Sequence, residues 1–239
     1  MGRIRRYRTA WSRHHRSGGF GIHSPFAFHF VQRVLGERLP YYAYADIAKW
    51  RMMAKDSAGR RWRKPRVISF KNAKMLFRIA NFFNPKHLLV IGANYGVSAA
   101  SVKAVSSQSV IHLYSPKFEG SIIQQKLLLP FGERLRHFVD LNACLQSYFS
   151  VLAPDEHPFV LINEISDEME YNALKSAILP FINQHAVVVM RNLTSNPLLA
   201  KLWQELKDHA EYGQTYTNEK IGIIIANPKL QLEHFFLWF

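Results

Sequence analysis

The stretch His87-Leu-Leu-Val-Ile-Gly-Ala-Asn-Tyr-Gly-Val-Ser98 decides the fold of this chain. Residues 88–91 form a short apolar run with β-branched members, as expected of a parallel strand covered on both faces. Gly92 and Gly96 let the backbone turn sharply and approach a ligand closely where a helix begins. A strand, a glycine turn and a helix form the ligand crevice of an open α/β sheet. We therefore expect such a sheet, with its crevice at this turn.

The glycine spacing alone does not identify a ligand. Ala93 and Asn94 follow Gly92, where a dinucleotide-binding G-x-G-x-x-G motif would have its second glycine. The stretch also lacks the Lys-Ser/Thr pair that ends a phosphate-binding P-loop. The order of predicted strands and helices along the rest of the chain gives further information about the class of protein.

Strands and helices alternate from residue 88 onward. The predicted strands are residues 88–91, 110–114, 136–139, 159–162 and 186–190, and the predicted helices are residues 97–105, 122–129, 142–152, 167–179 and 198–210. Two closing strands follow at residues 214–217 and 221–226, with a tail strand near residues 235–239. This alternation predicts a doubly wound α/β fold, a mostly parallel seven-stranded sheet with helices on both faces.

The charge divides the chain at about the same place as the fold pattern. Residues 1–66 carry 16 Lys or Arg against 3 Asp or Glu, whereas residues 67–239 carry 15 against 14. We therefore predict a basic N-terminal helical extension over residues 1–66 and the α/β domain over residues 67–239. The extension has a helical stripe at residues 26–39, after Ser24-Pro25, and a basic, turn-like stretch at residues 56–65. A helix over residues 69–83 should end at Asn84-Pro85.

Two basic clusters in the extension indicate a polyanionic partner. Residues 3–16 hold six arginines with Tyr7 and Trp11 between them, and residues 60–66 hold five further Lys or Arg. Such segments suit phosphate contact and base stacking, and they suit an anionic membrane surface about as well. A solvated tail that aids solubility is the plain alternative. Nucleic acid, an anionic surface and a plain tail all stay open at this point.

Composition and missing motifs exclude several other classes. The single cysteine, Cys144, excludes an internal disulfide and a thiolate zinc site, and it fits a cytoplasmic location. No apolar run approaches the roughly 20 residues needed to span a bilayer, so we do not expect an integral membrane protein. No G-x-S-x-G nucleophile elbow is present, and Cys144 lies in a helical pattern without an evident base, which argues against hydrolase chemistry.

The order of motifs resembles that of class I S-adenosylmethionine-dependent methyltransferases. In that family the first strand ends in an acidic residue followed by G-x-x-x-G or G-x-G. Gly92 and Gly96 match this glycine spacing, while Val90 stands in the place of the acid. The opening Gly21-Ile-His-Ser-Pro-Phe26 resembles that of a subgroup of small bacterial methyltransferase-like proteins. Residues 74–89 resemble the helix before their first strand, and residues 220–239 resemble their last strands, so the likeness covers residues 21–239.

The resemblance implies S-adenosylmethionine as the cofactor, bound at the carboxyl ends of the strands. The cofactor-binding residues that it implies are Gly92, Ala93, Asn94, Tyr95, Gly96, Tyr114, Asn163 and Glu164. Val90 and Tyr114 stand where the family commonly has acids, and Glu164 is the one acid left near the crevice. Each lost charged hydrogen bond costs about 1.5–3 kcal/mol, so we expect weak cofactor binding.

A metal is not expected. Metal-dependent relatives hold Mg²⁺ or Ca²⁺ with acids that follow the fourth and fifth strands. Such hard cations prefer carboxylate and other oxygen ligands. Here Asn163, Arg191 and Asn192 stand at those positions, and Arg191 would bring a positive charge to the place of the metal.

The sequence therefore predicts an S-adenosylmethionine-dependent methyltransferase-like protein with impaired or lost catalysis. If catalysis is lost, the protein is a pseudoenzyme. Methyl transfer depends chiefly on proximity and orientation, so the missing acids do not exclude activity, and no catalytic residue is identified. The alternative is a non-catalytic binding or scaffold protein whose basic extension binds nucleic acid or an anionic surface. His23 either lines the crevice or supports the start of a helix, and we favour the structural role.

Overall fold

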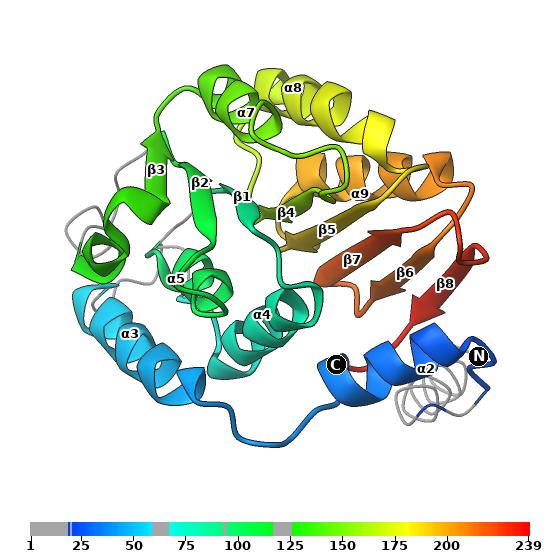
Figure 1. The fold of residues 1–239 in the computed structure, drawn as a ribbon, viewed down its shortest axis with the longest axis horizontal. Helices are drawn as coiled ribbons and strands as arrows, with labels where there is room; N and C mark the ends of the chain where they lie inside the picture. Colours follow the sequence, from blue (N-terminus) through cyan, green and yellow to red (C-terminus); the bar gives the residue numbers. More distant parts are fainter. Residues whose placement is uncertain (1–18, 20, 59–66, 93–94, 117–125) are drawn as a thin grey trace.

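An eight-stranded sheet forms the centre of the molecule (Figure 1). The computed structural model describes residues 19, 21–58, 67–92, 95–116 and 126–239. The strands, in chain order, are β1 (His87–Ile91), β2 (Val110–Tyr114), β3 (Leu135–Phe138), β4 (Phe159–Ile162), β5 (Ala186–Arg191), β6 (Gln214–Thr217), β7 (Ile221–Ala226) and β8 (Glu233–Phe236). Their order across the sheet is β3-β2-β1-β4-β5-β7-β6-β8.

The first five strands run parallel, and the closing pair introduces the antiparallel part. β7 pairs antiparallel with β5 and with β6, and β8 pairs parallel with β6. The sheet therefore has the seven predicted strands, and the predicted tail strand adds the eighth at the edge. All residues of β4, β5 and β7 are buried, which explains why these strands read as continuous apolar runs rather than alternating ones.

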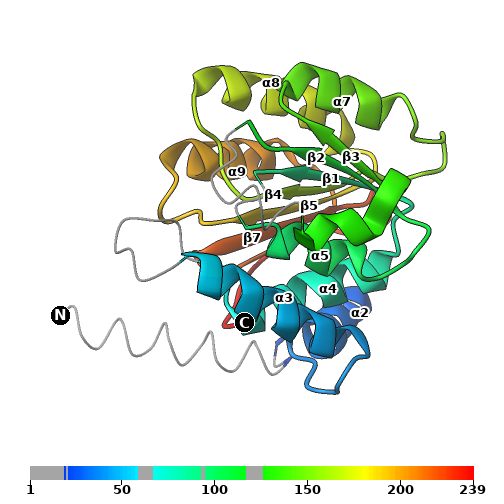
Figure 2. The same ribbon diagram turned by 90° about the vertical axis from the view of Figure 1, so that its left-hand side faces the viewer.

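Helices cover both faces of the sheet, as predicted for a doubly wound fold (Figures 1 and 2). One face carries α7 (Leu141–Phe149), α8 (Glu168–Ile178) and α9 (Pro197–His209), and the other carries α2 (Pro25–Phe30), α3 (Ala43–Ala58), α4 (Phe70–Phe83) and α5 (Val97–Lys103). Successive residues of β1 enter different cores: Leu88 and Val90 belong to the cluster under α4 and α5, and Leu89 and Ile91 to the cluster under α7 and α8. This is the period of two that a strand buried on both faces requires.

Local signals in the chain explain where α4 begins and ends. The Ser69 side chain accepts a hydrogen bond from the Asn72 amide at 3.1 Å, which satisfies one of the free N–H groups of the first turn. The helix ends at Asn84, which adopts the left-handed conformation with φ of 44°, and Pro85 follows it. The predicted helix over residues 69–83 is confirmed.

The N-terminal helices pack on the same core as α4. The helix predicted over residues 26–39 consists of α2 and a π-helical turn, η1 (Val31–Leu35), and so it ends four residues early. The Arg78 guanidinium explains this end, because it donates hydrogen bonds to the carbonyls of Val34 at 2.6 Å and Leu35 at 3.2 Å. Phe30 and Ile47 are fully buried in the cluster that also contains Val90.

The prediction for residues 56–58 was wrong, and some other predictions concern residues outside the described part of the chain. Helix α3 was not predicted, and residues 56–58, which we expected in a loop, are its last turn. Its buried face consists of only three residues, Ala43, Ile47 and Ala54, so its apolar periodicity is weak. The basic clusters at residues 3–16 and 60–66 and residues 122–125 of another predicted helix lie outside the described residues.

Candidate cofactor site

The carboxyl ends of four parallel strands meet at one edge of the sheet. Ile91 pairs with Tyr114 on one side and with Ile162 on the other, so β1, β2 and β4 end at the same level. The Gly92 amide donates to the Tyr114 carbonyl at 2.9 Å, and the Asn163 amide donates to the Ile91 carbonyl at 2.9 Å. We call the residues at this edge the strand-end site: 92–96, 114, 163–164 and 191–192.

The glycine turn has the backbone conformation that its spacing predicts. Gly92 has φ of 70°, and Gly96, which caps the start of α5, has φ of 79°. A Cβ placed on Gly92 would lie 2.5 Å from Cγ and 3.2 Å from Oε1 of Glu164. The Glu164 side chain therefore lies directly against the turn, and the glycine makes this close approach feasible. Ala93 and Asn94 lie outside the described residues.

Asn163 connects the ends of three strands. Its fully buried side-chain amide donates to the carbonyl of Gly92, and its side-chain oxygen accepts from a guanidinium nitrogen of Arg191. The Asn192 side chain donates to the Asn163 carbonyl at 3.0 Å. Asn163, Arg191 and Asn192, the residues expected at the ends of the fourth and fifth strands, thus converge. Both polar atoms of the Asn163 side chain form hydrogen bonds with other protein groups.

Arg191 places a positive charge at the strand-end site. Its side chain is 7% exposed, and burial lowers its pKa to about 10 while the nearby Glu164 charge opposes that shift. Because this pKa lies well above 7, the guanidinium stays charged at neutral pH. Its Nε atom has no hydrogen-bond partner in the described part of the chain.

A divalent metal does not fit these side chains. Apart from the Glu164 carboxylate, the strand ends offer amide oxygens and a guanidinium, whereas a hard cation in a protein prefers several oxygen ligands with carboxylates among them. Among the described residues, no group of three or more His, Cys, Asp or Glu side chains is arranged to hold a metal ion.

Tyr114 is anchored to a helix. Its buried hydroxyl donates to Oε1 of Glu170 at 2.7 Å, and burial together with the Glu170 carboxylate raises the pKa of the Tyr114 phenol. The other carboxylate oxygen of Glu170 accepts from the Ser166 amide at 2.7 Å. Glu170 was not identified from the sequence, although Asp167 three residues earlier, which accepts from the Glu170 amide, marks the start of α8.

Val90 and Tyr95 contribute to the core. Val90 is 0% exposed and belongs to the cluster under α4 and α5, so its side chain makes no polar contact at the strand ends. Tyr95 is 7% exposed and belongs to the same cluster. The structure places the acidic side chain of Glu164 directly against the glycine turn.

The Gly21–Phe26 segment lies at the opposite edge of the sheet. Ser24 caps α2, and its hydroxyl accepts from the Gln214 side chain at 2.8 Å. Gln214 begins β6, which runs in the same direction as β1, so this contact marks the amino edge of the sheet. His23 is exposed there, remote from Gly92 along the strand direction, and its structural role near the start of α2 stays a prediction.

Comparisons with known proteins identify the fold. No family model and no curated protein matches the chain. An O-methyltransferase from Bacillus cereus in complex with SAH matches with a TM-score of 0.54 and 14% identity, over 81% of this chain and 96% of that one. SAH-bound PaMTH1 from Podospora anserina matches with a TM-score of 0.54 and 12% identity, over 87% and 98%. TomG from Streptomyces achromogenes, an O-methyltransferase in complex with SAM, matches with a TM-score of 0.51 and 14% identity, over 79% and 91%.

This chain has the fold of a class I S-adenosylmethionine-dependent methyltransferase. The strand-end site occupies the edge of the sheet where open α/β folds bind ligands. No helix in the described part of the chain is both long and apolar enough to cross a membrane.

Proposed function

We propose that this protein is a methyltransferase-like protein that binds S-adenosylmethionine weakly at the strand-end site, without a metal, and has impaired catalysis. The observation that carries the proposal is the close approach of the Glu164 side chain to Gly92. The glycine turn is retained, and a single carboxylate lies against it. Val90 and Tyr114, at the two other expected acidic positions, are turned to the core and to Glu170.

The remaining groups suit part of the cofactor. S-adenosylmethionine carries a positive sulfonium and a positive ammonium, and both favour a carboxylate neighbour. Gly92, Gly96 and Glu164 would hold the cofactor by backbone approach and by one charge. The buried guanidinium of Arg191 partly offsets the Glu164 charge. One acidic contact in place of several predicts low affinity, because each charged hydrogen bond contributes about 1.5–3 kcal/mol.

The chemistry supplied by the cofactor is an activated methyl group. A nucleophile attacks that methyl in line, so the protein's part is to position both groups and exclude water. Asn163, through its contacts with Gly92 and Arg191, keeps the strand ends at fixed positions. No side chain at the site is assigned as a base.

Isothermal titration with S-adenosylmethionine and SAH tests the proposal. We expect weak binding by the parent chain, and binding at least about tenfold weaker in Glu164→Gln, which keeps the shape and removes the charge. Glu211→Gln is the matched control, because it removes an equal charge from an exposed glutamate outside the strand-end site. Tighter binding in Glu164→Ala would contradict the proposal, since it would mean that Glu164 obstructs the site.

A second candidate function is a non-catalytic binding protein that uses the basic extension. The charge of residues 1–66 favours it. The partner, a nucleic acid or an anionic surface, and the cytoplasmic location remain predictions. Titration of the full chain with a single-stranded oligonucleotide and with anionic vesicles at two salt concentrations would separate the partners. Binding to neither at low salt would refute this candidate.

A further inference from the structure

Two hollows lie at opposite edges of the sheet and differ in charge. The first has a volume of about 610 Å³ and lies at the amino edge, and the second has a volume of about 920 Å³. We call the second the basic hollow. Its charged lining residues are Arg33, Glu37, Arg38, Lys71, Lys74 and Arg78.

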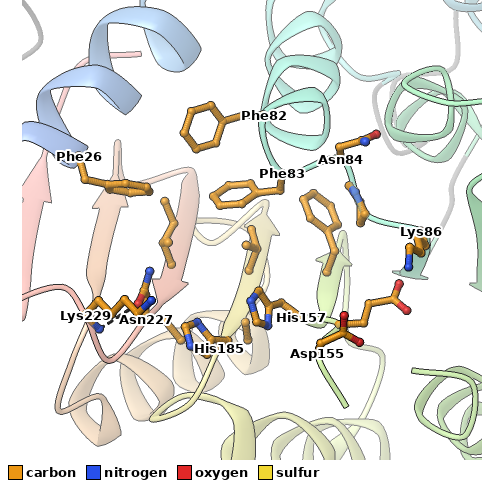
Figure 3. A pocket seen from close by; sticks show the side chains of 17 residues that line it. Phe26, Phe82, Phe83, Asn84, Lys86, Asp155, His157, His185, Asn227 and Lys229 are labelled. Atoms are coloured by element: carbon orange, nitrogen blue, oxygen red, sulfur yellow. Dashed lines mark hydrogen bonds between the residues drawn. The ribbon is translucent and has the colours of Figure 1, made fainter. Parts of the chain in front are cut away.

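The hollow at the amino edge is balanced in charge. Figure 3 shows Phe26, Phe82 and Phe83 on one side and the stacked rings of His157 and His185 on the other. Its charged lining residues are two lysines, Lys86 and Lys229, and two acids, Asp155 and Glu156. This hollow therefore serves as an internal comparison for the basic one.

The basic hollow lies toward the carboxyl edge of the sheet. It is lined by the first turns of α4, which runs back toward the start of β1, and by Trp238 and Phe239, which follow the carboxyl end of β8. β8 is parallel to β6, and β6 has the direction of β1. The hollow is thus at the same edge as the strand-end site. The first turn of α4 carries no acidic residue, so its free N–H groups add to the positive potential.

The single acidic side chain of the lining makes its hydrogen bonds to backbone amides. Glu37 Oε1 accepts from the backbone amides of Arg38 at 2.6 Å and Leu39 at 2.8 Å, and this lowers the pKa of the Glu37 carboxyl. Three of the cations, Arg33, Arg38 and Lys71, are exposed and form no ion pair within 4 Å in the described part of the chain, although the Arg33 charge helps to lower the pKa of Glu37.

The other two cations are held in place by packing. The Lys74 ammonium lies 5.0 Å from the ring centre of Tyr44 and 4.7 Å from that of Phe70. The buried guanidinium of Arg78 donates to Val34, Leu35 and Tyr44. The hollow therefore has five cations against one side-chain carboxylate, and part of this charge is preorganised.

We propose that the basic hollow binds a ligand that carries a diphosphate group. A single carboxylate or phosphate would leave most of these cations without a partner, whereas linked phosphates present several charges at one place. The diphosphate belongs either to a free molecule or to a nucleotide. Trp238, which is 60% exposed, is the aromatic residue of the lining that is most open to solvent. The inference does not depend on cofactor binding at the strand-end site.

Calorimetric titration of the full chain with inorganic pyrophosphate and with ADP tests this proposal. We expect both to bind the parent chain, and the double variant Arg38→Glu/Lys71→Glu to weaken both at least about tenfold. The matched control is Lys86→Glu/Lys229→Glu, which makes the same charge change with exposed lysines of the hollow at the amino edge. It should bind both probes within about twofold of the parent.

The comparison of the two probes identifies the source of the diphosphate. Equal affinity for pyrophosphate and ADP indicates the diphosphate alone, and tighter ADP binding indicates a nucleotide. Absence of binding of both probes by the parent would overturn the proposal. An equal loss in the two double variants would also overturn it, because it would reflect net charge alone. Binding of S-adenosylmethionine should be the same in all three proteins, so a failure of the proposed function is recognised separately.

Discussion

His112 in β2 should make the stability of this protein depend on pH. The imidazole is 0% exposed, lies parallel to the Phe138 ring at 6.3 Å and meets the Tyr148 ring edge-on at 5.5 Å. Its Nδ1 lies 3.3 Å from the Ser147 hydroxyl, and its Nε2 has no partner in the described part of the chain. Burial, with the charge of Arg136 as a second cause, lowers the pKa of His112 to about 4.

The sign and size of the effect follow from this pKa. The unfolded chain binds a proton at His112 below about pH 6.5, whereas the folded chain binds it only below about 4. Stability therefore falls as the pH drops from about 6.5 to 4, and is unaffected by this group above that window. At pH 5 His112 lowers the free energy of unfolding by about 2 kcal/mol, since each pH unit below the unfolded-state pKa of about 6.5 costs about 1.4 kcal/mol until the folded-state pKa is reached.

Urea denaturation at pH 7 and pH 5 measures this loss. The parent should lose about 2 kcal/mol more than His112→Leu between the two pH values, whatever the variant's stability at pH 7. The comparison with the variant is needed because burial also lowers the pKa of His87, His185 and His234. An equal loss in the two proteins would show that His112 is protonated in the folded state, and the reasoning would be wrong.

Three further predictions concern the strand-end site and the adjoining core. Tyr114→Phe should lower the free energy of unfolding by about 1.5–3 kcal/mol, because it removes a buried hydrogen bond to the Glu170 carboxylate; urea denaturation would measure this, and an unchanged midpoint would contradict the bond. Val90→Glu should destabilise the fold by about 3 kcal/mol or more by burying a carboxylate without a partner, and an unchanged melting temperature would mean that the side chain reaches the site instead of the core. Stoichiometric Mg²⁺ or Ca²⁺, or EDTA, should leave the melting temperature unchanged, and a rise with either ion would show that the site holds a metal after all.

Most of the fold was predictable because its signals are local. The strand at residues 88–91, the glycine turn and the Ser69 and Asn84 ends of α4 each depend on residues close together in the chain. Helix α3 was missed because only three small or medium residues form its buried face. The early end of η1 also escaped prediction, since it depends on Arg78, more than 40 residues away in the chain.

The position of the candidate site could be predicted from the sequence, but several of its side-chain contacts could not. Parallel strands bring Gly92, Asn163 and Arg191 to one edge, so their convergence follows from topology. The partner of Tyr114 does not, because Glu170 is 56 residues away in the chain and lies on helix α8. The same holds for the burial of Val90, whose orientation depends on which face of β1 points toward α4 and α5.

The central claim is that the strand-end site retains a weakened capacity for S-adenosylmethionine, and direct calorimetric titration of the full chain tests it. Loss of two acidic contacts predicts a dissociation constant on the order of 1 mM, weakened further by Glu164→Gln and unaffected by Glu211→Gln. A dissociation constant on the order of 1 μM for the parent would contradict impaired binding. Equal affinity in Glu164→Gln and the parent would contradict the role of Glu164.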